Sequence, residues 1–260
     1  MNDSPPTRLL ILGGTTEAAA LARALAGRPG IECISSLAGR TREPAALPGS
    51  TRVGGFGGAA GLVEYLRAER IAAVIDATHP FAAQISTHAV AAARAADVPL
   101  LRLERAPWRR VPGDRWVEVG SLAEAAVAAP KYGRRAFLTV GATELQPFAG
   151  LATMRFLVRL IDRPTAPLPL ADSKIVIGRG PFSLAGEEKL LRQHAIELVI
   201  AKNSGGEATY AKIAAARTLG LPVIMVRRPA KPEADHLAET VAAAVAWVEA
   251  QWGEGKQGAQ

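Results

Sequence analysis

The chain has 260 residues, 49% of them hydrophobic and 21% charged, which suits two folded domains and excludes a chain that is disordered throughout. Its net charge is +7, but the basic residues are dispersed and only 5% of the residues are aromatic, so nucleic-acid binding is not expected. Neither a run of about 20 apolar residues that could span a membrane nor a signal-peptide pattern at residues 1–7 is found. We therefore expect a cytoplasmic protein with no membrane partner. The single cysteine, Cys33, lies in an apolar segment and is expected to be a core thiol.

The chain alternates predicted strands and helices. In the first half the strands are at 8–12, 31–36, 71–76 and 98–104, the helices at 16–26, 58–68 and 82–95, and a long loop at 38–57. In the second half the strands are at 136–140, 154–160, 174–178, 197–201 and 222–227, the helices at 144–150, 183–194, 207–219 and 236–251, and a loop at 161–173. Proline and glycine interrupt any regular pattern at 105–120, which we interpret as a linker. Strands that alternate with helices through short turns predict parallel sheets.

One strand–helix–strand unit occurs twice. The tetrapeptide AAAR at 91–94 recurs at 214–217, and Arg105, which closes the first copy, has a counterpart 123 residues later in Arg228. We predict an α/β protein of two Rossmann-like parallel-sheet domains, residues 1–105 for a nucleotide and residues 106–260 for its substrate, with the last strand and helix free to pack back on the first domain. Because the copies are similar, their closing strands, 98–103 and 222–226, could be exchanged between the two sheets.

The first strand ends in a glycine turn. The residues between this strand and the first helix are Gly13, Gly14, Thr15, Thr16 and Glu17. Glycines let a pyrophosphate approach the backbone, and a helix N-terminus supplies N–H donors and the positive end of its dipole. The pattern predicts a nucleotide-binding turn. The alternative is a tight strand–helix turn capped by Thr15 or Thr16.

The second strand ends in hydroxyl side chains, where an NAD-binding domain commonly has an acidic one. Ser36 is followed by Arg40, Thr41 and Arg42. A guanidinium group pairs well with a phosphate, so this segment predicts NADP(H) as the cofactor. The alternative is a solvated basic loop.

A third tip holds Thr78, His79 and Pro80 after a buried strand, where a Rossmann-like sheet presents the nicotinamide. We expect these residues to contact the cofactor, although a lone histidine is commonly structural. Metal binding is not expected, because His79 and His88 do not have the i, i+4 spacing and the sequence has no Cys/His cluster.

Two polar tips follow strands of the second half. One holds Arg179, Gly180, Pro181 and Phe182, and the other holds Lys202, Asn203, Ser204 and Gly205. The carboxyl ends of parallel strands share one sheet edge, so the two tips predict an anion-binding crevice for a substrate. Two independent surface loops are the alternative.

Four of these tips in combination resemble the precorrin-6A reductase family of cobalamin biosynthesis. They read GGTTEA at 13–18, DATHPFA at 76–82, GRGPF at 178–182 and KNSGG at 202–206. The segment 102–108, which contains Arg105 and Trp108, is similar to the link between the two halves in that family. The combination covers most of the chain and is far more specific than any one motif.

The resemblance implies two Rossmann-like domains and the NADPH-dependent reduction of precorrin-6A to precorrin-6B, without metal or flavin. It implies a polyanionic tetrapyrrole between the domains, with its carboxylates bound by Arg105, Arg179 and Lys202 and with Trp108 in contact, and a transient hand-over of product to the next enzyme of the pathway.

The reduction needs a hydride at one carbon and a proton at its neighbour. The proton donor stays open among His79, Lys202, Tyr210 and a held water. Rival functions are cobalt-precorrin-6A reductase, another NADP-dependent Rossmann reductase or epimerase, and a non-catalytic sensor of nucleotide and tetrapyrrole. The reductase or epimerase is weakened because no tyrosine of the chain is followed by lysine at i+4.

Overall fold

The computed structural model describes residues 5–39 and 46–253, and the chain forms two compact units. Unit 1 consists of the chain up to Arg105 together with the segment from Ala230 onward, and unit 2 consists of Ala106–Pro229. Each unit contains a six-stranded sheet in which all strand pairs are parallel. The predicted fold class, α/β with two Rossmann-like sheets, is confirmed.

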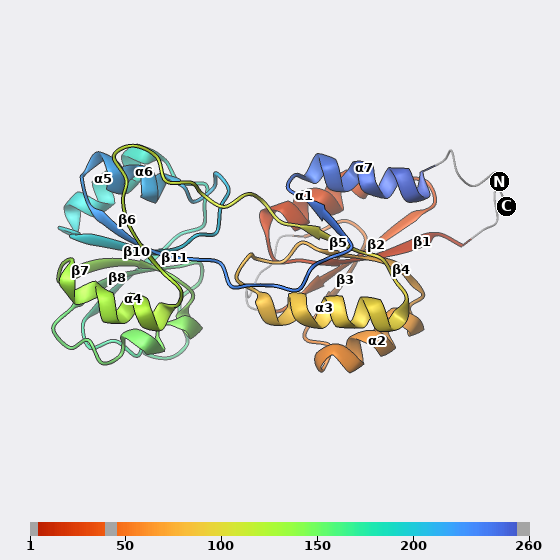
Figure 1. The fold of residues 1–260 in the computed structure, drawn as a ribbon, viewed down its shortest axis with the longest axis horizontal. Coiled ribbons are helices and arrows are strands. Elements are labelled where there is room, and N and C mark those ends of the chain that lie inside the picture. The colour runs from red at the N-terminus through yellow and green to blue at the C-terminus, as the bar shows by residue number, and fades with distance from the viewer. Residues whose placement is uncertain (1–4, 40–45, 254–260) are drawn as a thin grey trace. The chain divides into compact units, whose positions relative to one another are not determined.

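Unit 1 has its sheet in the order β12-β5-β4-β1-β2-β3. The strands are β1 (Thr7–Leu12), β2 (Ile31–Leu37), β3 (Ser50–Val53), β4 (Ile71–Asp76), β5 (Leu100–Leu103) and β12 (His236–Ala238), and the helices are α1 (Thr16–Leu25), α2 (Gly58–Ala68), α3 (Ala83–Ala96) and α7 (Val241–Trp252). Figure 1 shows α1 and α7 on one face of this sheet and α2 and α3 on the other.

β1, a central strand of the sheet in unit 1, is apolar on both sides because helices cover both faces of the sheet. Leu9 and Ile11 are buried in the cluster that includes residues of α1 and α7. Leu10 and Leu12 alternate with them and are buried in the cluster that includes residues of α2 and α3. This alternation follows from the two-residue period of a strand.

Cys33 on β2 belongs to the core of unit 1, as predicted. Burial raises the pKa of its thiol to about 11. The neutral thiol is therefore favoured by folding: the contribution to stability is complete below the ordinary pKa of 9.0 and is lost as the pH rises toward about 11. We expect Cys33 to react slowly with a thiol-specific disulfide reagent at pH 8 in the folded chain and fast after unfolding in urea. Equal rates in the two states would contradict this burial.

Unit 2 repeats the arrangement, with the order β6-β11-β10-β7-β8-β9. The strands are β6 (Arg115–Val119), β7 (Arg135–Thr139), β8 (Arg155–Leu160), β9 (Ser173–Ile177), β10 (Leu198–Lys202) and β11 (Pro222–Val226), and the helices are α4 (Leu122–Ala128), α5 (Leu184–Gln193) and α6 (Ala211–Thr218). Matching β1–β5 to β7–β11 gives the same strand order in both units. Figure 1 shows α5 and α6 on one face of the sheet and α4 on the other.

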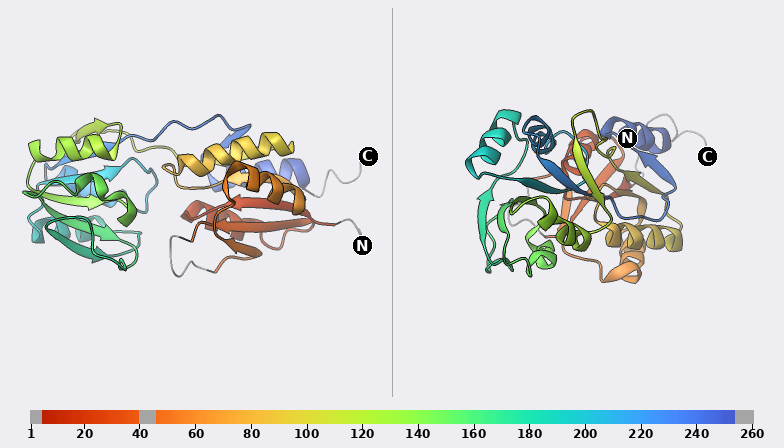
Figure 2. Two further views of the ribbon diagram at one scale, coloured as in Figure 1. Left: turned by 90° about the horizontal axis from the view of Figure 1, so that it is seen from below. Right: turned by 60° about the vertical axis from the view of Figure 1, so that its left-hand side comes forward.

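The predicted exchange of closing strands is wrong, because β5 pairs with β4 and β11 pairs with β10, each in its own unit. The strands that come next in the chain cross instead. β6 follows β5 in sequence but pairs with β11, and β12 follows β11 but pairs with β5. The two crossing connections can be followed by colour in Figure 2. The closing strands stay in place because α3 and α6 tie them to β4 and β10 through short connections, whereas the segments after them are long enough to cross.

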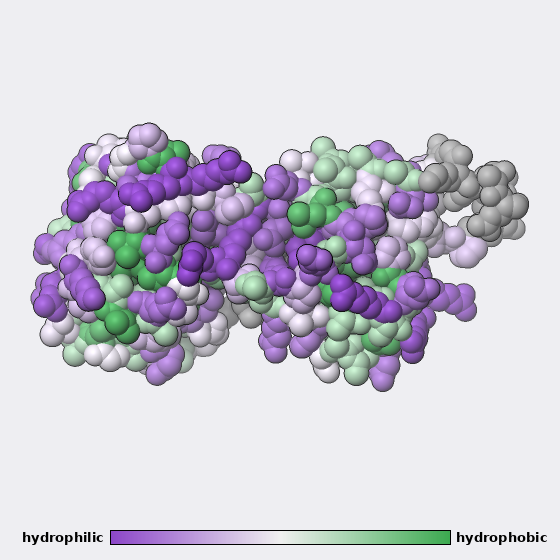
Figure 3. All heavy atoms as spheres, in the orientation of Figure 1, coloured by the Kyte–Doolittle hydropathy of each residue, from purple (hydrophilic) through white to green (hydrophobic). Residues whose placement is uncertain are grey.

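Several short elements lie where the sequence indicated loops or longer helices. β3 falls in the expected loop 38–57, β6 in the expected linker 105–120, and β12 at the start of the expected final helix. The expected helix 144–150 is replaced by two 3₁₀ turns, Ala142–Glu144 and Gln146–Phe148. Within residues 5–39 and 46–253, no helix is long and apolar enough to cross a membrane. On the face drawn in Figure 3, apolar residues form small separate patches among hydrophilic ones on each unit.

Candidate cofactor and substrate sites at the sheet edges

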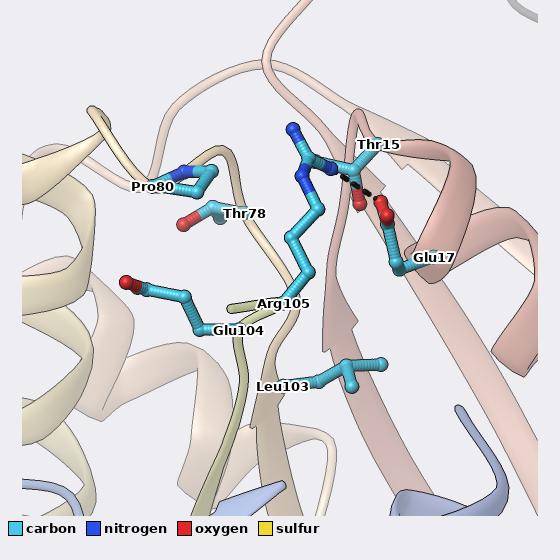
Figure 4. Close-up of a pocket in the computed structure, with 7 residues that line it drawn as sticks. All are labelled: Thr15, Glu17, Thr78, Pro80, Leu103, Glu104 and Arg105. Atoms are coloured by element: carbon cyan, nitrogen blue, oxygen red, sulfur yellow. Dashed lines mark hydrogen bonds and ion pairs between the residues drawn. The ribbon is translucent and has the colours of Figure 1, made fainter. Parts of the chain in front are cut away.

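The candidate cofactor site of unit 1 lies at the carboxyl ends of β1 and β4. These strands are neighbours, and the chain leaves β1 for α1 on one face of the sheet and β4 for α3 on the other. Such a switch point is where open α/β sheets bind ligands. A small pocket opens here, as Figure 4 shows. Its lining residues are Thr15, Glu17, Thr78, Pro80, Leu103, Glu104 and Arg105.

Thr15 connects the two strand ends. Its hydroxyl oxygen accepts a hydrogen bond from Ala18 N at 3.1 Å, which caps α1, and it donates to the Ala77 carbonyl at 2.7 Å. Thr15, rather than Thr16, is therefore the cap. Gly14 has a φ of +106°, which favours glycine, and a Cβ built on it meets no atom within 4 Å. The structure thus brings the turn 13–17 and the tip 78–80 together, as the sequence predicted.

A buried ion pair supports the tip after β4. Asp76 accepts hydrogen bonds from the backbone N and the hydroxyl of Thr78, at 3.2 and 2.6 Å. Its other oxygen lies 3.4 Å from Nε of Arg102, which also donates to the Pro232 carbonyl at 2.8 Å. Both charged side chains are buried. Sequence reasoning missed Arg102, whose signal was a charged residue inside the otherwise apolar strand β5.

His79 is half-buried and its ring orientation is fixed from one side. Its Nδ1 accepts a hydrogen bond from Phe81 N at 3.2 Å. An accepting Nδ1 carries no proton, so the neutral ring has its proton on Nε2 and can donate from there.

Arg105 lies in the pocket of unit 1, where its guanidinium pairs with Glu17 at 2.6 Å (Figure 4). The neighbouring Glu104 pairs with Lys231 at 2.6 Å. Both carboxylates of the pocket therefore have a cationic partner. The sequence had assigned Arg105 to the substrate.

The end of β2 has no acidic side chain in the part that the structure describes, which runs through Gly39. Ser36 is buried there, and its hydroxyl accepts a hydrogen bond from Arg52 Nη1 at 2.9 Å. Arg40, Thr41 and Arg42, the predicted phosphate ligands, lie outside the described residues. Arg52 was not predicted as a site residue, because β3 lies inside the expected loop 38–57.

In unit 2 the tips after β9 and β10 lie side by side. Phe182 N donates to the Ala208 carbonyl at 3.2 Å, and a Cβ built on Gly180 would come within 2.6 Å of the same oxygen. The ring of Phe182 lies 3.9 Å from the Arg159 guanidinium, which forms two hydrogen bonds with Glu187, at 2.9 and 2.6 Å. Arg179 is exposed between Gly178 and Gly180, and the Ser183 hydroxyl caps α5 by accepting from Gly186 N.

Lys202 at the end of β10 pairs with Glu144, with Nζ at 2.7 and 2.9 Å from the two carboxylate oxygens. Glu144 comes from the 3₁₀ turn after β7 and also accepts from Gly141 N at 3.0 Å. Sequence reasoning missed this carboxylate, since nothing in its local pattern indicates that it meets Lys202.

Two hydrogen bonds join Asn203 and Trp108. Trp108 N donates to the Asn203 side-chain oxygen at 2.8 Å, and the Asn203 amide donates to the Trp108 carbonyl at 3.0 Å. The indole of Trp108 donates to the Gly206 carbonyl at 2.8 Å and is buried. These bonds attach the start of unit 2 to the turn after β10.

Tyr210, a proton-donor candidate, accepts a hydrogen bond from Arg217 at 2.6 Å. Arg217 lies two turns farther along α6, and its pKa is raised chiefly by its hydrogen bond to Asp114. The Tyr210 hydroxyl is thus directed along α6, away from the strand tips. In the part of the chain that the structure describes, no group of three or more His, Cys, Asp or Glu side chains could hold a metal ion.

Comparison with known proteins gives a consistent result. Residues 8–249 match the family described as "Precorrin-6x reductase CbiJ/CobK". The chain is 50% identical to a precorrin-6A reductase of Rhodococcus erythropolis (93% of this chain, 97% of the relative) and 51% identical to one of Rhodobacter capsulatus (93% and 96%). A solved structure titled "CobK precorrin-6A reductase" has 49% identity and a TM-score of 0.89, over 96% of this chain and 99% of that one.

Proposed function

The chain belongs to the precorrin-6x reductase family, an oxidoreductase family of cobalamin biosynthesis, and we propose that it reduces precorrin-6A with NADPH bound to unit 1. The observation that carries the cofactor assignment is the pocket at the switch point of unit 1, which joins a glycine turn, a helix N-terminus and the tip 78–80. The macrocycle, a polycarboxylate, is assigned to the tips of unit 2.

The residues of unit 1 fit a dinucleotide. The left-handed φ of Gly14 and the open space around it leave the backbone accessible before α1, where N–H groups and the helix dipole attract a pyrophosphate. We assign the pyrophosphate to Gly13, Gly14, Thr15, Thr16 and Glu17. Through Gly39, the last described residue after β2, no carboxylate follows this strand, which favours NADPH over NADH.

When bound, NADPH supplies the hydride. The residues of the chain position the cofactor and exclude water. Thr78 and Pro80 line one side of the pocket, and the hydrogen bonds from Thr78 to Asp76 hold that side in one conformation. His79 lies between them in sequence and is not among the lining residues. Arg105 neutralises Glu17, so the carboxylate does not repel a pyrophosphate at the same turn.

In unit 2 we assign the substrate carboxylates to Arg179 and Lys202, with Gly180, Pro181, Phe182, Ser204 and Gly205 around them. Arg159 and Glu187 hold Phe182 in place, and Asn203 and Trp108 hold the turn after Lys202. For the proton we keep His79, Lys202 and a held water as candidates, since the Tyr210 hydroxyl is bonded to Arg217.

The test is to mix the purified protein with NADPH and precorrin-6A and to follow both absorbance spectra. Loss of the NADPH band together with a changed tetrapyrrole spectrum is the expected result. A bound tetrapyrrole spectrum without turnover would instead indicate a sensor. Running the cobalt-loaded substrate in parallel measures which of the two forms the enzyme prefers.

We expect Lys202→Ala and Glu144→Gln to change the KM for the tetrapyrrole in opposite directions. Removing the lysine removes an anion-binding charge and should raise KM by roughly tenfold, the worth of one charge-assisted hydrogen bond. The glutamine keeps an acceptor for Gly141 N but no longer competes for Lys202, so KM should fall. Initial rates at saturating NADPH give both values, and added salt should raise the wild-type KM.

The matched control is Arg155→Ala, which removes a cation of unit 2 at the opposite end of the strands, paired with Asp172 and 72% exposed. Its KM should stay within about twofold of the wild type. A KM that is unchanged by Lys202→Ala, or raised equally by the control, would reject the assignment of Lys202 to the substrate.

A further inference from the structure

Arg52 is the last residue but one of β3 and lies next to the carboxyl end of β2. Arg52 and Ser36 are register partners in the parallel pair β2–β3, and Nη1 of Arg52 donates to the Ser36 hydroxyl at 2.9 Å. The same nitrogen donates to the Gly54 carbonyl at 3.0 Å, and Nη2 donates to the Gly55 carbonyl at 3.0 Å. These bonds hold the guanidinium at the strand end where a Rossmann-like domain places the adenosine ribose.

The guanidinium is also stacked. Its central carbon lies 3.8 Å from the ring centroid of Phe56 and 5.1 Å from that of Tyr65. Hydrogen bonds and ring contacts together fix the group before any ligand arrives, which lowers the entropy cost of binding. Three of its five N–H groups serve these acceptors, so two remain for another acceptor.

Arg52 has no carboxylate partner among the described residues, in contrast to the other arginines at sites in unit 1. Arg102 pairs with Asp76 and Arg105 pairs with Glu17. Its acceptors are the neutral Ser36 hydroxyl and the Gly54 and Gly55 carbonyls, so no carboxylate of residues 5–39 and 46–253 forms an ion pair with this half-buried guanidinium. An oriented cation of this kind is suited to an anionic group with several oxygens.

Gly55 provides an independent observation. Gly54, Gly57 and Gly58 have φ values of +118°, +76° and +95°, which explains why they are glycines. Gly55 does not have such a φ, and a Cβ built on it meets no atom within 4 Å. Neither conformation nor packing within the described chain requires glycine at this position. A ligand lying against the backbone would require it.

We propose that Arg52 selects NADPH over NADH by pairing with the 2′-phosphate of the adenosine, with the Gly55 backbone against the same group. The inference rests on the proposed use of a nicotinamide dinucleotide by unit 1. It adds a specificity residue that is independent of Arg40, Thr41 and Arg42. A 2′-phosphate offers oxygen acceptors to the remaining N–H groups, whereas the 2′-hydroxyl of NADH offers no charge.

The test compares adenosine 2′,5′-bisphosphate with adenosine 5′-monophosphate by calorimetry, which needs no turnover. Arg52→Gln should weaken binding of the bisphosphate by about 10- to 100-fold, the range of a charge-assisted hydrogen bond, and leave the monophosphate within twofold. Arg52→Lys keeps the charge without the fork and should recover part of the loss. In kinetics, the KM for NADPH should rise while kcat and the KM for NADH stay near the wild-type values.

Two control variants distinguish a ligand contact of Arg52 and Gly55 from a purely structural role. Arg67→Gln removes an exposed arginine of α2 that donates to the Ala95 carbonyl, and it should leave both affinities unchanged. Gly55→Ala should weaken the bisphosphate, whereas Gly150→Ala, at a glycine of unit 2 that also has open space, should not. Thermal unfolding of each variant shows whether unit 1 remains folded.

Equal weakening of both nucleotides by Arg52→Gln would assign Arg52 to the structure of the loop and overturn the proposal. If the wild type prefers NADPH and Arg52→Gln leaves the affinity for the bisphosphate unchanged, the proposal for Arg52 is also overturned. The proposed function would stand in that case. A wild type that binds neither NADPH nor the bisphosphate would overturn both.

Discussion

A chain that ends at residue 229 is expected to lose the fold of unit 1 and its binding of NADPH, while unit 2 stays folded. The deletion removes β12, the neighbour of β5, and α7, which packs on α1. Ala244 and Val248 of α7 are fully buried in the core, and Trp247 and Trp252 pack against it. Unit 2 loses nothing, because all six of its strands lie within 106–229.

The expected loss in unit 1 is large compared with its stability. Burying one valine or leucine side chain contributes about 1.5–3 kcal/mol, so the valines and tryptophans of α7 together are worth several kcal/mol. A domain of this size is commonly stable by only about 5–15 kcal/mol. The deletion also turns β5 into an edge strand with open hydrogen-bonding groups, which favours aggregation.

Tryptophan fluorescence reports on both units in the full chain and on unit 2 alone in the chain 1–229, since each unit contains two of the four tryptophans. Trp108 and Trp116 lie in unit 2, and Trp247 and Trp252 lie in unit 1. The fragment 106–229 should unfold cooperatively in urea, and the chain 1–229 should show the same transition alone. NADPH binding to the chain 1–229, or to the fragment 1–110, with the affinity of the full chain would show that β12 and α7 are dispensable.

The sequence predicted the strands with the strongest apolar patterns and missed the short ones. β1, β4 and β10 are buried runs bounded by turn residues, so their periodicity identifies them. β3 has four residues, none of them buried, and β12 has three, so neither has a hydrophobic pattern long enough to recognise. Because β6 and β12 were not recognised, the crossing was assigned to the wrong strands.

Site residues were predicted where they have a local sequence pattern and were missed where they do not. Glycine turns after apolar strands are local signals, which is why the tips at Gly13 and Lys202 were found. The partner of each charged group is set by the register of distant strands, as for Arg52 with Ser36 and Glu144 with Lys202. No local pattern encodes such pairs. The pairing of Arg105 with Glu17 in the pocket of unit 1 is a further example, and the assignment of Arg105 to the substrate stays a prediction.

Replacing Arg102 by alanine is expected to destabilise unit 1 by about 3–5 kcal/mol, the usual cost of removing one member of a buried ion pair. The side chains of Arg102 and Asp76 are only 8% and 1% exposed, so the carboxylate that remains would be buried without its cation. The substitution also removes the hydrogen bond to Pro232, which attaches the returning chain ahead of β12. Urea unfolding, followed by tryptophan fluorescence, measures the change, and the transition of the fragment 106–229 identifies the contribution of Trp108 and Trp116 in unit 2.

The double variant Arg102→Leu with Asp76→Asn separates the charge from the packing. If the cost comes from the uncompensated carboxylate, the double variant should be more stable than Arg102→Ala, since no buried charge remains and the amide can still accept from Thr78. The matched control is Arg155→Ala, whose exposed pair with Asp172 should contribute at most about 1 kcal/mol. A loss from Arg102→Ala that is no larger than this control would mean that the pair does not hold the tip of β4 in place. The kcat of the double variant then shows whether the tip at Thr78 and His79 needs the charge pair or only the hydrogen bonds to residue 76.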